Sequence, residues 1–368
     1  MKIPSKILPL TEKQDRCSTF MFRDDHTFLV GHNLDESYEV PGVIAINKRN
    51  VQKTSISFFE ILTAQKPPSP TCNWTSRYGS VTFNALGREF PDGGINEAGL
   101  YIQEMTLAET VFPQDNTRPK MFMMQWMQYQ LDNFDAVKLV LASSTQIVLD
   151  GWEWHFFVSD IDGNCASIEF LEGKPSIHTG SSMPVPVLCN THYPQEIEKL
   201  EQYEGFGGDK PVDLHDKTIP RFVHATHMIQ NPPDPVSIDY GFEILKTLER
   251  GSTRWSYIID VYNQSVCFHT SLAKERKYFD IPAFDLSCDT PARMLDIHSN
   301  LKDNVAGHFV DFSLQLNRQF VEALADALSP SAEIIGVIEA HRNTVQNVIK
   351  TVSEYPDSTT CVPQKTEA

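Results

Sequence analysis

The sequence predicts an α+β fold in which antiparallel β-sheets carry helices on their outer faces. Four stretches alternate apolar and polar residues on both sides of a polar turn, as antiparallel β-hairpins do. Blocks with helical periodicity stand between these hairpins rather than after every strand. This order favours antiparallel sheets with helices packed against them over the alternating βα units of a parallel, Rossmann-type sheet.

The four expected hairpins occupy residues 18–31, 78–90, 155–170 and 255–270. Their turns are placed at residues 24–26, 86–87, 162–164 and near Asn263. Each turn contains aspartate, asparagine or glycine, which tolerate the backbone angles of tight turns. Each hairpin is therefore expected to supply two neighbouring antiparallel strands.

Six further segments have helical patterns. The first begins after Pro119 and is dense in methionine and aromatic residues, which indicates an adaptable core lining and a candidate wall for an apolar pocket. The expected helices span residues 120–142, 194–203, 221–230, 240–249, 310–328 and 332–353.

The chain has 368 residues, enough for two or three domains or for one large layered domain. The candidate seams at residues 65–70, 206–216 and 231–235 are short, and no Gly/Ser-rich or Pro-rich linker divides the chain. We therefore expect one domain. The polar residues 356–368 are expected to form a disordered tail.

The formal net charge of −17 disfavours nucleic acid and anionic membrane surfaces as partners. No segment approaches the roughly 18–20 apolar residues of a membrane span, and the first sixteen residues lack the apolar run of a secretion signal. The seven cysteines are spread singly, which indicates mostly reduced thiols, and the sequons at Asn73 and Asn263 matter only in a secretory compartment. The sequence therefore predicts a cytoplasmic protein.

Cys17 and Asp35 form the first candidate catalytic pair. They stand at the open end of the first hairpin, so strand pairing brings them near each other. A thiol with a pKa of about 8.5 is mostly protonated at neutral pH, so a catalytic cysteine needs a base. If the chain were cut before Cys17, the new α-amine would be such a base, and Asp35 would orient it. A lone cysteine at a strand end, however, is more often just a small buried residue.

Five sequence motifs favour the catalytic interpretation of Cys17 over that of a small buried residue. They are CSTF at 17–20 with GHNLD at 31–35, DGGINEAGL at 92–100, FFVSDIDGNCASIEF at 156–170, CNTHYP at 189–194 and IPRF at 219–222. Together they resemble, in the same order, the choloylglycine hydrolase and penicillin V acylase family, which are linear amide C-N hydrolases of the N-terminal-nucleophile superfamily. One such motif is weak evidence, but five in order over more than half of the chain are hard to explain by chance.

The resemblance implies four catalytic residues. Cys17 matches the nucleophile, and Asp35 matches the partner of its freed amine. Asn190 matches the asparagine whose amide donates to the oxyanion, a contribution of about 3–4 kcal/mol in a dry, preorganised site. Arg221 matches the active-site arginine, whose permanent charge would favour an anionic nucleophile and orient Asp35. Without the family pattern, Arg221 is an ordinary arginine at the start of a helix.

Four further residues are expected to complete or support the site. The second oxyanion donor of the family is a backbone N–H that falls at or near Thr106. His32 stands where the better-known relatives carry arginine, and since imidazole can be neutral, one fixed positive charge can be missing here. Asn33 and Asn96 are plausible supports, although a satisfied turn asparagine explains each equally well.

The resemblance implies a four-layer αββα sandwich, with residues 1–16 removed as a propeptide by autoproteolysis and residues 17–355 forming the catalytic domain. The expected activity is hydrolysis of a non-peptide linear amide through a Cys17 thioester, with the Cys17 α-amine as general base. Three alternatives stay open: an acyltransferase with an amine acceptor, a non-catalytic binding protein that keeps the fold, and, less favoured, a Cys-His protease.

No organic cofactor and no metal are expected. His224 and His227 have helical spacing, but no third ligand stands near them in the sequence. The expected partner is a small-molecule N-acyl amide, and the sequence neither supports nor excludes bile salts or penicillins. The oligomeric state stays open, although members of the family commonly form homotetramers.

Overall fold

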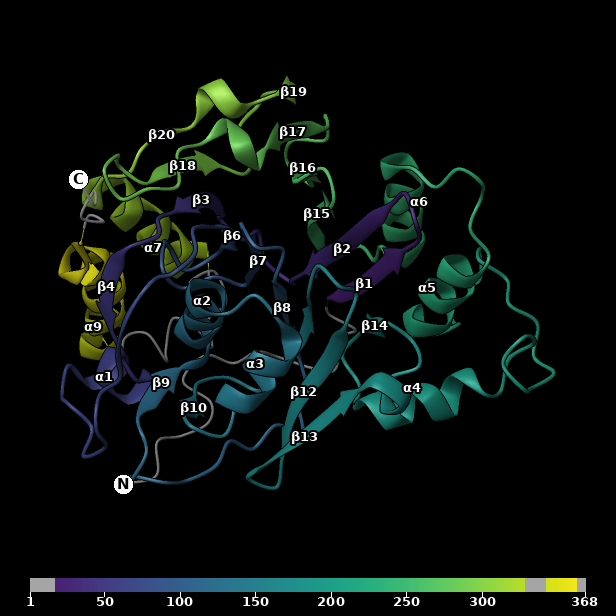
Figure 1. Ribbon diagram of the computed structural model, residues 1–368, viewed down its shortest axis with the longest axis horizontal. Helices are drawn as coiled ribbons and strands as arrows, with labels where there is room; N and C mark the ends of the chain where they lie inside the picture. Colours follow the sequence, from purple (N-terminus) through teal and green to yellow (C-terminus); the bar gives the residue numbers. More distant parts are fainter. Residues whose placement is uncertain (1–16, 328–341, 363–368) are drawn as a thin grey trace, which may run out of the picture.

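Two large β-sheets form the centre of the computed structural model, which describes residues 17–327 and 342–362 (Figure 1). All strand pairs of the first sheet are antiparallel except β17 with β19. Its order is β14 (Val187–Leu188), β1 (Ser18–Arg23), β2 (Phe28–Asp35), β15 (Thr253–Asp260), β16 (Ser265–Thr270), β17 (Lys277–Asp280) and β19 (Asp303–Asn304).

The second sheet is antiparallel throughout. Its order is β13 (Lys174–Thr179), β12 (Cys165–Leu171), β11 (Trp154–Ser159), β8 (Tyr101–Thr106), β7 (Gly93–Asn96), β6 (Ser80–Asn84), β3 (Val43–Asn47), β18 (Arg293–Asp296) and β20 (Val310–Asp311). Two small sheets join β10 (Val148–Asp150) to β9 (Lys120–Phe122), and β21 (Thr360–Cys361) to β4 (Val51–Thr54) and β5 (Asn73–Thr75).

The two large sheets pack face to face through aromatic side chains. The rings of Phe83 on β6 and Tyr257 on β15 stack with centroids 4.0 Å apart. The hydroxyl of Tyr257 also lies 3.0 Å from that of Tyr101 on β8. Every residue of β2 is buried, as expected for a strand covered on both faces.

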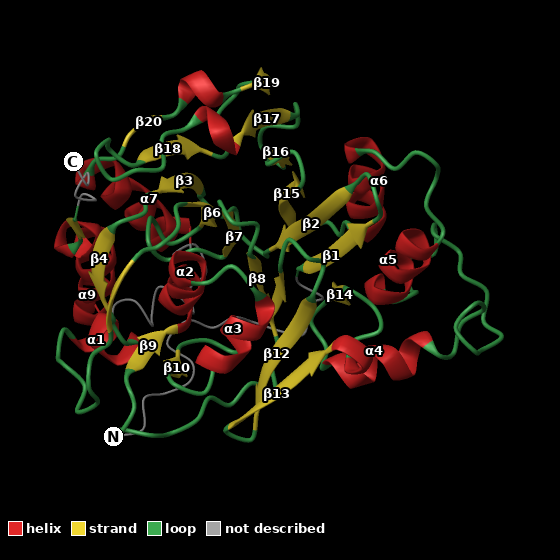
Figure 2. Cartoon of the chain, in the orientation of Figure 1, coloured by secondary structure: helices red, strands yellow, loops and turns green. Residues whose placement is uncertain are grey.

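Helices cover the outer faces of both sheets, which completes the four layers (Figure 2). Helices α5 and α6 pack on β1, β2 and β15, with α4 beside α5, while α2 packs on β7 and β8. The helices are α1 (Phe58–Thr63), α2 (Met123–Asn133), α3 (Val137–Ser143), α4 (Tyr193–Leu200), α5 (Arg221–Gln230), α6 (Ile238–Leu248), α7 (Leu314–Ala327) and α9 (Arg342–Glu354), with short 3₁₀ turns at Gly180–Ser182, Ile281–Ala283, Ala306–His308 and Tyr355–Ser358. The predicted αββα sandwich is therefore confirmed.

Three of the four expected hairpins are present as β1–β2, β11–β12 and β15–β16. The prediction for residues 78–90 is wrong in its second strand, because β6 pairs with β7, which begins only at Gly93. The intervening residues form a buried loop in which Gly87 and Glu89 have positive φ angles of 102° and 77°. That backbone conformation is incompatible with a strand at these positions.

The predicted helix at residues 120–142 is divided into β9, α2 and α3. Its first residues pair with β10 instead of coiling, and α2 ends where Phe134 turns extended, with φ −124° and ψ 153°. The predicted helix at residues 310–328 begins with β20, and α7 starts only at Leu314. Of the predicted helix at residues 332–353, the structure describes α9, and the remainder lies outside the described residues.

The end of the described chain corrects two expectations. Residues 356–362 are ordered rather than disordered, because β21 pairs with β4 and Cys361 forms a disulfide with Cys288. The expectation of reduced thiols is wrong for this pair. Among the described residues, no helix has the length and apolar character needed to span a membrane.

Candidate active site

Cys17 stands immediately before β1, which lies between the edge strand β14 and β2 in the first sheet. In the pairing of β1 with β2, Ser18 lies opposite Asn33, so Cys17 comes next to the last residues of β2. Cys17 is only 2% exposed. Its φ angle of 61° falls in the left-handed region, which is uncommon for a residue with a side chain.

Asp35, the last residue of β2, is fully buried and has partners on both carboxylate oxygens. Arg221 donates from Nη1 to Oδ2 at 2.6 Å. Thr253, paired with Asp35 across the β2–β15 ladder, donates its hydroxyl to Oδ1. These contacts hold the carboxylate in one orientation beside Cys17.

Arg221 is the first residue of α5, which packs on β1 and β14 (Figure 1). The preceding Pro220 suits this place, because proline tolerates the start of a helix where backbone N–H groups lack intrahelical partners. The arginine is 4% exposed, and its second terminal nitrogen donates to Oδ1 of Asn190 at 3.0 Å. One buried guanidinium thus joins Asp35 to Asn190.

Asn190 follows β14 and is half-buried. Its Nδ2 donates to the carbonyl oxygen of Thr106 at 2.9 Å. Leu107 donates its backbone N–H to Glu153, so the alternation of hydrogen bonds along a strand turns the N–H and C=O of Thr106 away from β11. The backbone N–H of Thr106 and the amide of Asn190 therefore lie on the same side of β8.

The charges around Cys17 oppose formation of a thiolate. Burial raises the pKa of the Cys17 thiol well above its usual range, and the carboxylates of Glu104 and Asp35 raise it further, against a hydrogen bond from the Asp35 backbone. Burial also raises the pKa of Asp35, although Arg221 and the Thr253 hydroxyl partly offset this rise. An efficient nucleophile at this position therefore requires a base that removes the thiol proton.

His32 is fully buried on β2 and remains uncharged. Burial lowers its pKa to about 3, and the nearby charge of Arg221 acts in the same direction. Its Nε2 lies 3.1 Å from Nε2 of Gln103, which also donates to the backbone of Asp92. The imidazole is therefore a neutral hydrogen-bonding group, and it supplies no fixed positive charge to the site.

The two predicted supporting asparagines have different surroundings. Asn33 donates to the carbonyl of Leu245 on α6 and accepts from the hydroxyl of Ser256 on β15. It therefore connects the first sheet to the helix that covers it. Asn96 donates to the carbonyls of Leu131 and Phe134, at 2.8 and 2.7 Å. It therefore satisfies the last turn of α2, and these contacts do not join it to the Asp35–Arg221–Asn190 network.

Sequence reasoning missed two residues beside the candidate pair. Thr253 belongs to no motif and lies 218 positions from Asp35. Glu104 is 2% exposed, and burial, followed by the charges of Asp92 and Glu36, raises its pKa well above the usual range. A charged residue inside an apolar strand, at 101–106, was the one signal available for Glu104.

Of the two histidines with helical spacing, His224 has a structural role. His224 is buried on α5, and its Nε2 lies 3.1 Å from the carbonyl oxygen of Asp213. Among the described residues, neither His224 nor His227 belongs to a group of three potential metal ligands.

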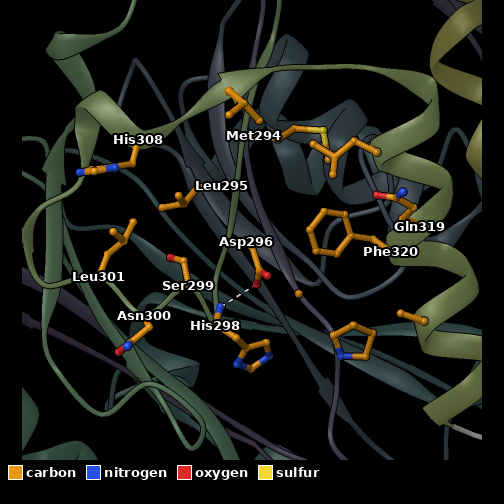
Figure 3. Close-up of a pocket in the computed structure, with 15 residues that line it drawn as sticks. Met294, Leu295, Asp296, His298, Ser299, Asn300, Leu301, His308, Gln319 and Phe320 are labelled. Atoms are coloured by element: carbon orange, nitrogen blue, oxygen red, sulfur yellow. Dashed lines mark hydrogen bonds between the residues drawn. The ribbon is translucent and has the colours of Figure 1, made fainter.

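A cavity of about 610 Å³ lies apart from these residues, between α7 and the segment that follows β18 (Figure 3). Phe320 and Gln319 face it from α7, and Asp296 and His298 face it from the opposite wall. None of its lining residues is a candidate catalytic residue.

Comparison with known proteins gives a consistent result. A penicillin V acylase from Pectobacterium atrosepticum is 24% identical over 287 residues, which cover 64% of this chain and 76% of the relative. Among solved structures, penicillin V acylase from Agrobacterium tumefaciens aligns with a TM-score of 0.70 and 22% identity, over 81% of this chain and 98% of the other. A variant of conjugated bile acid hydrolase from Clostridium perfringens aligns with a TM-score of 0.63 and 18% identity, over 78% and 98%.

The model of one protein family matches residues 17–240, and its first matched residue is Cys17. This match covers well over half of the chain, and the solved structures share its four-layer fold. The chain belongs to the linear amide C-N hydrolases of the choloylglycine hydrolase family.

Proposed function

We propose that this amide hydrolase uses Cys17 as its nucleophile after removal of residues 1–16. The observation that carries the proposal is the position of Cys17: it is the first residue of the family match and stands beside the network of Asp35, Arg221 and Asn190. Residues 17–355 would then form one catalytic domain. A single cluster of buried apolar residues that extends from Cys17 to Tyr355 supports this extent.

The backbone at Cys17 supports cleavage of the preceding peptide bond. A side-chain-bearing residue held at φ 61° stores roughly 1–3 kcal/mol of strain. The φ torsion exists only while the residue is joined to a preceding carbonyl carbon. Hydrolysis of the Arg16–Cys17 bond therefore releases the strain and leaves a free α-amine on the cysteine.

That α-amine is the base which the raised pKa of Cys17 requires. An α-amino group titrates near pH 7.7–8.0, roughly, so a useful fraction is neutral at physiological pH. It takes the thiol proton as sulfur attacks the carbonyl carbon of the substrate amide. Asp35, oriented by Arg221 and Thr253, accepts a hydrogen bond from the amine and stabilises the ammonium that forms.

The tetrahedral intermediate places negative charge on the former carbonyl oxygen. Nδ2 of Asn190 and the backbone N–H of Thr106 donate to this oxygen. The C–N bond then breaks, the ammonium returns its proton to the leaving nitrogen, and the acyl group remains on sulfur as a thioester. Water, deprotonated by the same α-amine, attacks the thioester carbonyl, and the carboxylic acid product leaves as the thiol is restored.

The expected substrate is a small molecule with an N-acyl amide bond. The relatives are named for penicillin V and for conjugated bile acids, so these two classes and N-acyl amino acids are the first to test. An added amine acceptor measures acyl transfer beside hydrolysis, and product ratios then separate a hydrolase from an acyltransferase.

Intact mass and N-terminal sequencing of active protein test the proposal directly. We expect a chain that begins at Cys17. Cys17→Ala is expected to abolish turnover, whereas Cys165→Ala, at a half-buried free cysteine, should leave it unchanged. An active enzyme that retains residues 1–16, or a Cys17→Ala variant with near-normal turnover, would contradict the mechanism.

A further inference from the structure

Glu169, His178 and His192 bring three potential metal-ligand atoms within 4.8 Å of one another. They come from β12, from β13 and from the residue before α4, which lie side by side in Figure 2. The three residues belong to one stretch of the chain, from β12 to the residue before α4, and the catalytic proposal uses none of them. We propose that they form a site for a divalent transition-metal ion, with zinc as the expected ion.

The two oxygens of Glu169 have different surroundings. Oε1 accepts the backbone N–H of Tyr193 at 2.8 Å and lies 3.3 Å from Nδ1 of His155. Oε2 faces Nε2 of His192 at 2.9 Å and Nε2 of His178 at 3.7 Å. One oxygen thus anchors the carboxylate to the protein, and the other is directed toward the two imidazoles.

The contact between Glu169 and His192 is close but is not aligned as a hydrogen bond. Oε2 of Glu169 is buried, and among the described residues neither this oxygen nor Nε2 of His192 has a hydrogen-bond partner of acceptable geometry. Two atoms that both bind a tetrahedral zinc ion at about 2.0–2.2 Å are separated by about 3.3–3.5 Å. The observed distances of 2.9 and 3.7 Å lie on either side of that value.

The surroundings provide the support and access that a metal site needs. His155 lies beside the cluster, with its Nε2 2.7 Å from the carbonyl oxygen of Cys189 and its Nδ1 3.3 Å from Oε1 of Glu169, so it links the ligand carboxylate to the backbone before Asn190. The side chain of Glu169 is inaccessible, whereas those of His178 and His192 are 16% and 22% exposed. Ions therefore reach the histidines from solvent, and metal binding replaces the 3.3 Å contact of His178 with the Ser176 hydroxyl.

The ligand types favour zinc, cobalt or nickel over calcium or magnesium. Two imidazoles and one carboxylate suit borderline transition metals, whereas calcium and magnesium prefer sites made only of oxygen atoms. Three protein ligands would leave a fourth position of a tetrahedral ion for water.

This metal would have a positioning role. His192 lies two residues after Asn190, and His155 contacts Cys189, the residue before Asn190. An ion bound to His192 and Glu169 therefore fixes the segment that carries Asn190 against β12. Any effect on turnover rests on the proposed function, but metal binding and stabilisation do not.

The test titrates metal-free, full-length protein with zinc in a calorimeter and records the visible spectrum of the cobalt(II) form. We expect one zinc per chain, a tetrahedral cobalt spectrum and a higher melting temperature. His178→Ala and His192→Ala should weaken zinc binding by more than the roughly 10–100-fold that is lost when a group hydrogen-bonded to a metal ligand is removed. His227→Ala, at a half-buried histidine of α5, is the matched control and should bind like the wild type.

The comparison uses variants whose metal-free melting temperature equals that of the metal-free wild type. Two histidine variants are available, so failure of one to fold leaves the other informative. Absence of saturable zinc binding, equal affinity in both variants and the wild type, or binding of calcium alone would overturn the proposal. Loss of turnover in Cys17→Ala together with normal zinc binding would support the two proposals separately.

Discussion

Arg221 donates to Oδ1 of Asn190 at 3.0 Å, and this contact decides which way the asparagine amide faces. Arginine carries only donors, so the amide oxygen must turn toward it. Nδ2 then faces the carbonyl of Thr106, and its second proton is available for a ligand. The same guanidinium binds Asp35, so one cation orients both the proposed oxyanion donor and the partner of the amine.

Replacing Asn190 tests the oxyanion role. Asn190→Ala removes one preorganised donor and is expected to lower kcat about 10²–10³-fold with a smaller change in KM. Steady-state kinetics on the best amide substrate measures the effect. The exposed Asn300→Ala serves as a control. A variant with unchanged kcat would show that the oxyanion is stabilised elsewhere.

The ion pair of Arg221 with Asp35 is expected to show strong coupling in stability. Arg221→Met leaves a buried carboxylate without its cation and should lower the free energy of unfolding by about 3–5 kcal/mol. Adding Asp35→Asn removes that charge, so the double variant should recover part of the loss. Urea unfolding of the wild type, Arg221→Met, Asp35→Asn and the double variant completes a double-mutant cycle. Losses of unfolding free energy that simply add in the double variant would argue against the ion pair.

Thr253 is expected to adjust the pH dependence of catalysis. Burial raises the pKa of Asp35, and the Thr253 hydroxyl opposes this rise. Thr253→Val should therefore raise that pKa further and move the acidic limb of the kcat/KM profile to higher pH. Thr253→Ser keeps the hydroxyl and should retain the wild-type limb. An unmoved limb in the valine variant would exclude control of Asp35 by this contact.

His32 is expected to make the fold sensitive to acid. Its pKa is about 3 in the folded state and near 6.5 when unfolded, so the unfolded chain takes up a proton first. The free energy of unfolding then falls as the pH drops from near 6.5 toward 3, by about 2 kcal/mol between pH 6.5 and 5. His32→Gln should remove this part of the slope.

Chemical denaturation across that pH range compares His32→Gln with the wild type. His26→Gln, at an exposed histidine, is the matched control and should leave the slope unchanged. Equal slopes in the His32 variant and the wild type would mean that His32 also takes up a proton in the folded protein.

The disulfide between Cys288 and Cys361 is expected to stabilise the fold. It closes a loop with a sequence separation of 73, and native disulfides typically contribute roughly 2–4 kcal/mol. Cys361→Ser should therefore lower the urea midpoint under non-reducing conditions, whereas Cys72→Ser should not. Identical midpoints for Cys361→Ser and the oxidised wild type would contradict this role.

The local part of the site was predictable because it depends on short-range pairing. A hairpin with its turn at residues 24–26 brings Cys17 and Asp35 together, and β1 pairs with β2, although Ser18 lies opposite Asn33 rather than opposite the His32 that this turn implies. The roles proposed for Asn190 and Arg221 rest on motif resemblance, since neither residue has a distinctive local pattern. No sequence motif indicated the proposed metal cluster, because its three ligands belong to three different structural elements.

Local patterns were insufficient where a distant segment supplied the decisive contact. Residues 120–122 have a helical pattern, yet they pair with β10 as a strand. Residues 356–362 of the polar tail are held in place by the disulfide from Cys361 to Cys288 and by the pairing of β21 with β4. In both cases tertiary contacts override the preference of the local sequence.

The sequence by itself determined the α+β class, three hairpins and the order of the family motifs, because periodicity and turn residues act over a few neighbouring positions. Only the tertiary structure decided that His32 is buried and uncharged, that Thr253 holds Asp35 and that Arg221 orients Asn190. The reason is physical: burial and long-range hydrogen bonds depend on which segments meet in the folded chain.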